Sequence, residues 1–191
     1  MSFQSRLSKM GQEKVWRMAA VGSLIFSSQM VNFPISGGTS GHLLGGVLAA
    51  LIIGPFEALL VMTIVLSTQA FLFGDGGVLA LGANTFNMGI IGALGGYAFF
   101  RFLMRGKAEK KGFLRSAFVA AWFSVIFAAI SASLEMVFSG TKALTLVLPA
   151  MILTHIAIGC MEGIITVAIL SLLMRRGYSL AVFEKKEMHD E

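Results

Sequence analysis

The amino-acid sequence predicts an all-α membrane protein, a polytopic helical bundle of about six transmembrane segments with the second one short. Hydrophobic residues make up 56% of the 191 residues and charged residues only 13%, about half the charged share of soluble domains. A water-soluble globule needs more polar surface than this, and a disordered chain has fewer apolar residues. The 22 glycines suit transmembrane helices, because glycine lets helix backbones approach closely.

The apolar stretches set the expected spans, because a helix needs about 20 apolar residues to cross the hydrocarbon layer. Five stretches suit this length: residues 18–35, 56–73, 78–104, 115–138 and 149–174. A further stretch, residues 42–53, is short, so we expect it to lie inside the bundle or to cross only partly. We place His42 at the start of this short helix and Pro149 in the first turn of the last span, where the missing N–H costs nothing.

The basic residues predict the orientation. Fourteen of the 15 lysines and arginines flank the spans at ends that six crossings place on one side, and only Lys142 falls on the other. By the positive-inside rule that side is the cytoplasm, so both termini are expected there. The net charge of +5 is then a feature of topology, and no nucleic-acid partner is predicted. A secretory signal peptide is the alternative at the N-terminus, but no small-residue cleavage site follows the long apolar stretch.

This orientation divides the chain into three parts. Residues 1–17 form a basic cytoplasmic segment, residues 18–174 the transmembrane domain, and residues 175–191 a charged cytoplasmic tail. The only cysteine is Cys160, which excludes an internal disulfide and a Cys-x-x-Cys metal or redox motif. The sequence contains no Walker A, His-Glu-x-x-His or Gly-x-Ser-x-Gly motif, so it gives no indication of an enzyme.

Polar residues at membrane depth are costly, and each is therefore a candidate for function. His42, Asp75, Asn84, Asn87, Glu135 and His155 all fall near the outer end of the expected bundle. We expect them to converge on one outward-facing pocket.

Three acidic residues in the expected spans have separate interpretations. Glu162 follows His155 by seven residues, which keeps the two on nearly the same helix face. Glu135 is expected to extend toward water at the end of its span. Glu57 lies at a helix start, where a carboxylate favours the positive end of the helix dipole.

Several strings of the sequence resemble one known family. The string FPISGGTSGHLLGG at residues 33–46 is similar to the signature of the CbiM/NikM family, and it is long enough to be specific. FLFGDGG at 71–77, LGANTFNMG at 81–89, HIAIG at 155–159 and EG at 162–163 follow in the family's order. The similarity covers roughly residues 18–174.

The resemblance implies a function. Members of this family are the substrate-binding membrane subunits of energy-coupling-factor cobalt and nickel importers. It implies that the chain binds Co(II) or Ni(II) outside the bacterial or archaeal cell membrane and works with a transmembrane coupling subunit and a pair of ATP-binding subunits. The metal is then the transported substrate, and no permanently bound cofactor is expected. Both metals suit the same donors, so the sequence does not choose between them.

The resemblance also implies a square-planar nitrogen site. The family's ligands are the amino group, the next amide and the side chain of a Met-His start, together with the histidine of the Gly-His-Leu-Leu-Gly block. The last of these maps onto His42, the primary metal candidate. Asn84 and Asn87 would line the site or orient its ligands, and His155 and Asp75 are the next candidates.

The beginning of the sequence departs from the family pattern. It reads Met1-Ser2-Phe3-Gln4 rather than Met-His, and the family's first span is absent. We expect a small separate membrane protein, or a start further upstream, to supply the other nitrogen donors. A membrane interaction or regulatory subunit that has lost its own metal site is the alternative function. An importer subunit for an organic nutrient such as a vitamin is a third, and it would need a larger pocket with aromatic walls.

Overall fold

The structure is a computed structural model that describes residues 3–35, 39–105 and 109–183. Residues 36–38 of the signature string and residues 184–191 of the charged tail, which include His189, lie outside the described residues. So do Met1, Ser2 and Lys107.

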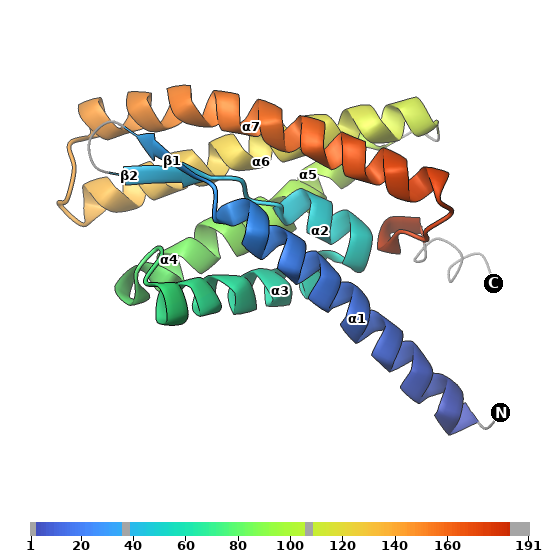
Figure 1. Cartoon of the computed structure of the whole chain (residues 1–191). Helices are drawn as coiled ribbons and strands as arrows, with labels where there is room; N and C mark the ends of the chain where they lie inside the picture. The colour runs from blue at the N-terminus through green and yellow to red at the C-terminus, as the bar shows by residue number, and fades with distance from the viewer. Residues whose placement is uncertain (1–2, 36–38, 106–108, 184–191) are drawn as a thin grey trace.

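The described chain is almost entirely helical, with one β-hairpin near its N-terminal end (Figure 1). The α-helices and strands are α1 (Phe3–Gln29), β1 (Asn32–Ile35), β2 (Thr39–His42), α2 (Gly46–Ile53), α3 (Pro55–Thr68), α4 (Leu81–Asn84), α5 (Gly96–Leu103), α6 (Lys110–Phe138) and α7 (Leu144–Arg175). A π-helical turn, Gln69–Phe73, extends α3. A 3₁₀ turn, Val78–Ala80, precedes α4, and a π-helical segment, Thr85–Gly95, joins α4 to α5.

Four helical units in the described chain are long and apolar enough to cross a membrane. They are Pro55–Phe73, Val78–Leu103, Lys110–Phe138 and Leu144–Arg175, close to four of the expected spans. The expected total of about six is not confirmed. As expected, the short stretch lies inside the bundle: α2 has eight residues, about 12 Å of helix, and nearly all of its side chains are buried.

The predicted first span, residues 18–35, is wrong at its C-terminal end. Helix α1 ends at Gln29, and residues 32–35 form β1, which pairs antiparallel with β2. Pro34 explains part of this change, because proline inside a helix removes a hydrogen bond and clashes with the preceding turn. Pro34 lies instead in a two-stranded ribbon, in which every strand is an edge strand and tolerates proline.

Two predicted helix starts are also wrong. His42 ends β2 rather than opening a helix, and α2 begins at Gly46 after Gly45 turns the chain with a φ of +72°, a conformation that glycine adopts without strain. The last helix begins at Leu144, so Pro149 lies inside it and not in its first turn. The neighbouring side chains Val147 and Met151 are buried, and their packing offsets the one backbone hydrogen bond that proline removes.

Helix α2 is the centre of the packing. Its residues Val47 and Leu51 pack with α5, α6 and α7, whereas Ala50 and Ile53 belong to a cluster with α1 and α3. A Cβ atom on Gly46 would lie 2.8 Å from the backbone nitrogen of Ala93, so this helix touches the π-helical segment backbone to backbone.

The two ends of the bundle differ. The hairpin, the connection between α3 and α4 and the connection between α6 and α7 lie at one end, which we call the hairpin end (Figure 1). The start of α1 and the end of α7 lie at the opposite end. The N-terminal part of α1 extends away from the bundle, and its later turns pack inward, through Val21 and Ile25.

Candidate functional site

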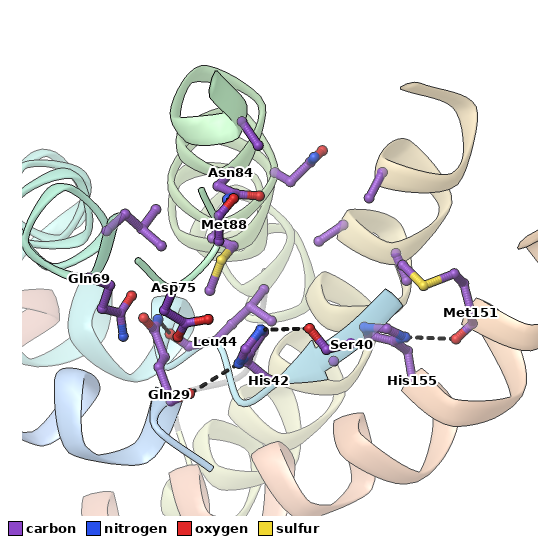
Figure 2. A pocket seen from close by; sticks show the side chains of 18 of the residues that line it. Gln29, Ser40, His42, Leu44, Gln69, Asp75, Asn84, Met88, Met151 and His155 are labelled. Atoms are coloured by element: carbon purple, nitrogen blue, oxygen red, sulfur yellow. Dashed lines mark hydrogen bonds between the residues drawn. The ribbon is translucent and has the colours of Figure 1, made fainter. Parts of the chain in front are cut away.

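A cavity of about 280 Å³ opens among the hairpin, α3, α4, the π-helical segment, α6 and α7. Five of the six polar residues that were expected to converge line it, namely His42, Asp75, Asn84, Asn87 and His155, whereas Glu135 does not. Figure 2 shows His42 and His155 on either side of Ser40, with Gln29, Gln69 and Asp75 grouped nearer to His42. The fold therefore brings these residues together from separate segments of the chain.

The backbone orients the imidazole of His42. Its Nδ1 atom lies 3.0 Å from the backbone carbonyl oxygen of Gln29 at the end of α1. A carbonyl only accepts hydrogen bonds, so Nδ1 carries the hydrogen and Nε2 carries the lone pair in the neutral ring. Ser40 Oγ lies 3.4 Å from Nε2, at the limit of hydrogen-bond reach. His42 thus has one fixed nitrogen and one nitrogen available to a ligand in the cavity.

The second imidazole of the cavity, His155, has the same arrangement. Its Nδ1 donates to the carbonyl oxygen of Met151 one helical turn earlier at 2.7 Å, which leaves the lone pair on Nε2. The ring packs against β2, because a Cβ atom built on Gly41 would lie 3.2 Å from His155 Nε2 and 2.6 Å from Ile158 Cδ1. Glycine at position 41 is therefore what lets α7 approach the strand that carries His42.

The two asparagines reach the cavity from one continuous helical unit. Asn87 donates from Nδ2 to Glu135 Oε2 at 2.8 Å, and Asn84 donates from Nδ2 to the carbonyl oxygen of Gly76 at 3.3 Å. Glu135 is half-buried, and its carboxylate accepts the hydrogen bond from buried Asn87, so it lies at the edge of the bundle core. Glu57 does lie in the first turn of α3, as expected, and it also forms an ion pair with Lys14.

Glu162 does not line the cavity but holds the chain behind it. Its side chain is 4% exposed, and its two carboxylate oxygens accept hydrogen bonds from the backbone N–H groups of Leu44 at 3.0 Å and Gly45 at 2.6 Å. These two residues link His42 to the start of α2. The polar stripe on α7 expected from the sequence therefore has two functions: His155 faces the cavity, and Glu162 caps the turn after His42.

The cavity also contains two buried amides that were not predicted from the sequence. Gln29 at the end of α1 and Gln69 at the end of α3 both line it. Gln29 Nε2 donates to the carbonyl oxygen of Leu44 at 3.0 Å. Gln29 Oε1, Gln69 Nε2 and Asn87 Oδ1 are buried without any hydrogen-bond partner among the described residues. A glutamine within an apolar helix is the signal that would have identified the first two.

The histidine, cysteine and acidic side chains of the described residues do not form a metal site by themselves. Within the described residues, no group of three or more His, Cys, Asp or Glu side chains could hold one. His42 and His155 each offer one imidazole nitrogen, a donor type that suits nickel and similar ions. A cation in the cavity would take its remaining ligands from the amides and methionines of the lining, from water or from another molecule.

Comparison with known proteins identifies similar chains. The family model described as "Cobalt uptake substrate-specific transmembrane region", CbiM, matches residues 2–180. A protein of Archaeoglobus fulgidus named as a fused nickel transport protein, NikMN, is 40% identical over 163 residues, which cover 84% of this chain and 54% of that protein. The cobalt transport protein CbiM of Thermosipho melanesiensis is 30% identical over 185 residues, covering 91% of this chain and 72% of that protein.

A solved structure is similar as well. The crystal structure of a transition metal transporter superposes with a TM-score of 0.74 at 32% sequence identity, covering 86% of this chain and 77% of that one. The chain thus spans about half the length of the fused nickel transport relative. It spans a larger share of the Thermosipho protein and of the solved transporter. All of these relatives are named as transport proteins, and none as an enzyme.

Proposed function

The chain belongs to the CbiM family of cobalt-uptake transmembrane regions, and we propose that it is the substrate-binding membrane subunit of an energy-coupling-factor importer for Co(II) or Ni(II). The metal is the transported substrate, and His42 is its first protein ligand. The names of the relatives, which are nickel and cobalt transport proteins, support this substrate class.

One observation carries the proposal. The cavity gathers two imidazoles whose Nδ1 atoms are both bonded to backbone carbonyls, so both Nε2 atoms are available as ligands. Metal-binding histidines in proteins usually have their second ring nitrogen bonded in this way, which fixes the tautomer and the ring direction. The Asp75 carboxylate lines the same cavity and adds a negative charge that attracts a cation.

The proposal also includes the orientation of the chain in the membrane and its partner subunits. We place the hairpin end outside the cell and both termini in the cytoplasm, so that the cavity collects the ion from outside. Transport then requires a transmembrane coupling subunit and ATP-binding subunits in other chains. Because one or two imidazoles are too few donors for tight Ni(II) binding, a small membrane protein that brings further nitrogen ligands is the third proposed partner.

A metal titration of the purified chain in detergent tests the proposal. We expect Ni(II) and Co(II) to bind, and His42→Ala to weaken the affinity by about a hundredfold, because loss of a direct ligand should cost at least as much as loss of an outer-shell contact. His189→Ala is the matched control, since it removes a histidine outside the described residues, and its affinity should equal that of the unmodified chain.

The same titration decides between the proposal and its alternative. A regulatory or interaction subunit without its own metal site is favoured by the absence of a three-ligand group among the described residues. That function predicts no binding, or equal binding by the unmodified chain and the His42→Ala variant. Either result would remove His42 from the metal site.

An importer for a vitamin-sized nutrient receives less support. Drug-sized ligands occupy pockets of roughly 300–1,000 Å³ with aromatic walls, whereas this cavity measures about 280 Å³. The described residues that line it include no Phe, Tyr or Trp. Besides leucine, alanine and glycine, the lining consists of two imidazoles, amides, a carboxylate, a hydroxyl and methionines, which suits a small cation.

A further inference from the structure

Gln29 is the last residue of α1, and only 1% of its surface is exposed. It contacts three other residues through polar atoms. Its backbone carbonyl oxygen accepts from His42 Nδ1 at 3.0 Å, and its side-chain Nε2 donates to the carbonyl oxygen of Leu44 at 3.0 Å. The same Nε2 lies 3.3 Å from Met62 Sδ on α3. One residue thus joins the end of α1 to α3 and to both sides of the position that follows His42.

The hairpin fixes the backbone of His42 but not the segment after it. His42 is the last residue of β2, and residues 43–45 belong to no strand or helix. Buried backbone groups in such a segment need partners from elsewhere in the fold. The backbone of Leu44 finds them on two sides, because its carbonyl accepts from Gln29 and its N–H donates to Glu162.

The carbonyl of Gln29 sets the direction of the imidazole. The last carbonyls of an α-helix have no partner within the helix, and His42 Nδ1 uses this one. The C-terminal end of a helix also carries a partial negative charge, which favours a ring N–H at this position and leaves Nε2 as the ligand atom. A hydrogen bond of this kind to the second ring nitrogen raises the basicity of a metal-binding imidazole.

We infer that Gln29 is a positioning residue of the metal site: its carbonyl oxygen directs the His42 ring, and its side-chain amide holds the turn after β2, so that Nε2 faces the cavity before the ion arrives. The inference rests on the proposed function, in which His42 ligates the metal directly. It adds a residue that acts through His42 without touching the ion. A ring that is already oriented loses less freedom when the ion binds, and the affinity is higher for that reason.

Gln69 provides the comparison within the same cavity. Like Gln29 it is a buried amide of the lining, 4% exposed. Its Nε2 atom, however, has no hydrogen-bond partner among the described residues, and its carbonyl accepts from the N–H of Asp75 rather than from the hairpin. Loss of this amide should leave His42 in place, so Gln69→Leu is the matched control for Gln29→Leu.

The ring can be observed directly by ¹⁵N NMR of the histidine-labelled chain in detergent, without metal and under conditions in which the ring is neutral. We expect the hydrogen of His42 on Nδ1 in the unmodified chain and in Gln69→Leu, with the signal assigned by its loss in His42→Ala. In Gln29→Leu both tautomers should appear, because the turn is no longer anchored to α1. A loss of stability alone would not redistribute the tautomers.

A nickel titration of the same preparations measures the effect on binding. Loss of contacts that orient a metal ligand typically lowers metal affinity by about 10- to 100-fold. Gln29→Leu should therefore weaken Ni(II) binding by about tenfold or more, whereas Gln69→Leu should not weaken it. Equal losses in the two leucine variants would show that the amide of Gln29 acts only in packing and would overturn the inference.

The outcomes separate this inference from the proposed function. Absence of Ni(II) binding by the unmodified chain would overturn the proposed function, whereas binding that Gln29→Leu does not weaken would overturn only the role of Gln29. If a thermal melt shows that Gln29→Leu does not fold, Gln29→Met, which keeps an unbranched side chain of similar length, replaces it. The spectrum of the unmodified chain is decisive in either case, because a hydrogen on Nε2 in place of Nδ1 would exclude the bond to the Gln29 carbonyl.

Discussion

Glu162 shows how one residue supports a site that it does not touch. It lies on α7, 117 positions along the chain from Gly45, yet its carboxylate accepts hydrogen bonds from two consecutive backbone N–H groups. Those groups lie at the N-terminal end of α2, where a negative charge is also favoured by the helix dipole. The turn that follows His42 is therefore held by a helix that is distant in the sequence but packs beside the hairpin.

Substitution of Glu162 should loosen this turn. In Glu162→Ala the N–H groups of Leu44 and Gly45 stay buried without acceptors, at a cost of about 1–3 kcal/mol each. We expect a lower melting temperature in detergent and weaker Ni(II) binding, because His42 is no longer held in place. The melt and the metal titration on the same preparation measure both effects.

Glu162→Gln provides the comparison. The amide of glutamine keeps one acceptor oxygen but turns an N–H₂ group toward the second backbone donor, so it should recover about half of the lost stability. If Glu162→Ala unfolds at the same temperature as the unmodified chain, the carboxylate does not hold the turn.

Metal binding itself should be visible in the stability of the protein. A ligand that binds only the folded chain stabilises it by about 2.7 kcal/mol at a hundred times its Kd. We expect saturating Ni(II) to raise the melting temperature, and a chelator to return it to the starting value. In His42→Ala the nickel-dependent rise should vanish, whereas a rise of equal size would place the ion elsewhere.

The site residues could be predicted in part from the sequence. Charged and amide side chains stand out in apolar helices because burial without partners is costly, and this rule selected residues that the fold places around one cavity. The metal role of His42 remains a prediction. The partners of Glu162 could not be predicted, since backbone N–H groups carry no sequence signal and the contact depends on how α7 packs against α2.

At the scale of elements, the close contact between α2 and the π-helical segment depends on Gly46. A Cβ atom there would lie 2.8 Å from Ala93 N and 2.9 Å from the carbonyl carbon of Gly92. Both are backbone atoms, which cannot move aside as a side chain can. The segment Thr85–Gly95 has 11 residues, longer than the single-turn π-bulges found in most helices, and it positions Asn87 at the cavity.

Gly46→Ala should therefore destabilise the protein by about 1–3 kcal/mol, the usual cost of overpacking a filled core. Gly82→Ala is the matched control, because no atom lies within 4 Å of its added Cβ. In that helical position alanine is favoured over glycine by up to about 1 kcal/mol. The melting temperature should thus fall for the first variant and hold or rise for the second, and a stable Gly46→Ala would contradict the backbone contact.

The long helical units could be predicted from the length of their apolar stretches. The turns and the hairpin could not. Four long apolar stretches became helical units, because the required span fixes their length. The hairpin was missed because residues 30–35 continue the apolar run of α1, and hydropathy alone does not distinguish a short strand from the end of a helix. Pro34 and the following glycines were the local signal of a break.

At the scale of the whole molecule, most of the basic residues lie at one end of the bundle and the cavity lies at the other. The start of α1 and the end of α7 share one end of the bundle, and the hairpin and the cavity are at the other (Figure 1). Basic residues flank the first of these ends: Arg101 and Arg105 at the end of α5, and Arg175 and Arg176 at the end of α7. Because lysine and arginine are retained on the cytoplasmic side, the cavity is expected to face outward.

Cysteine labelling in intact cells tests this orientation. In a Cys160→Ser background, Thr141→Cys places an exposed thiol in the connection between α6 and α7, and Glu109→Cys places one at the start of α6. A membrane-impermeant maleimide should label the first in intact cells and the second only after permeabilisation. The reverse pattern would turn the cavity toward the cytoplasm, and such a chain could release a metal ion into the cell but could not collect one from outside.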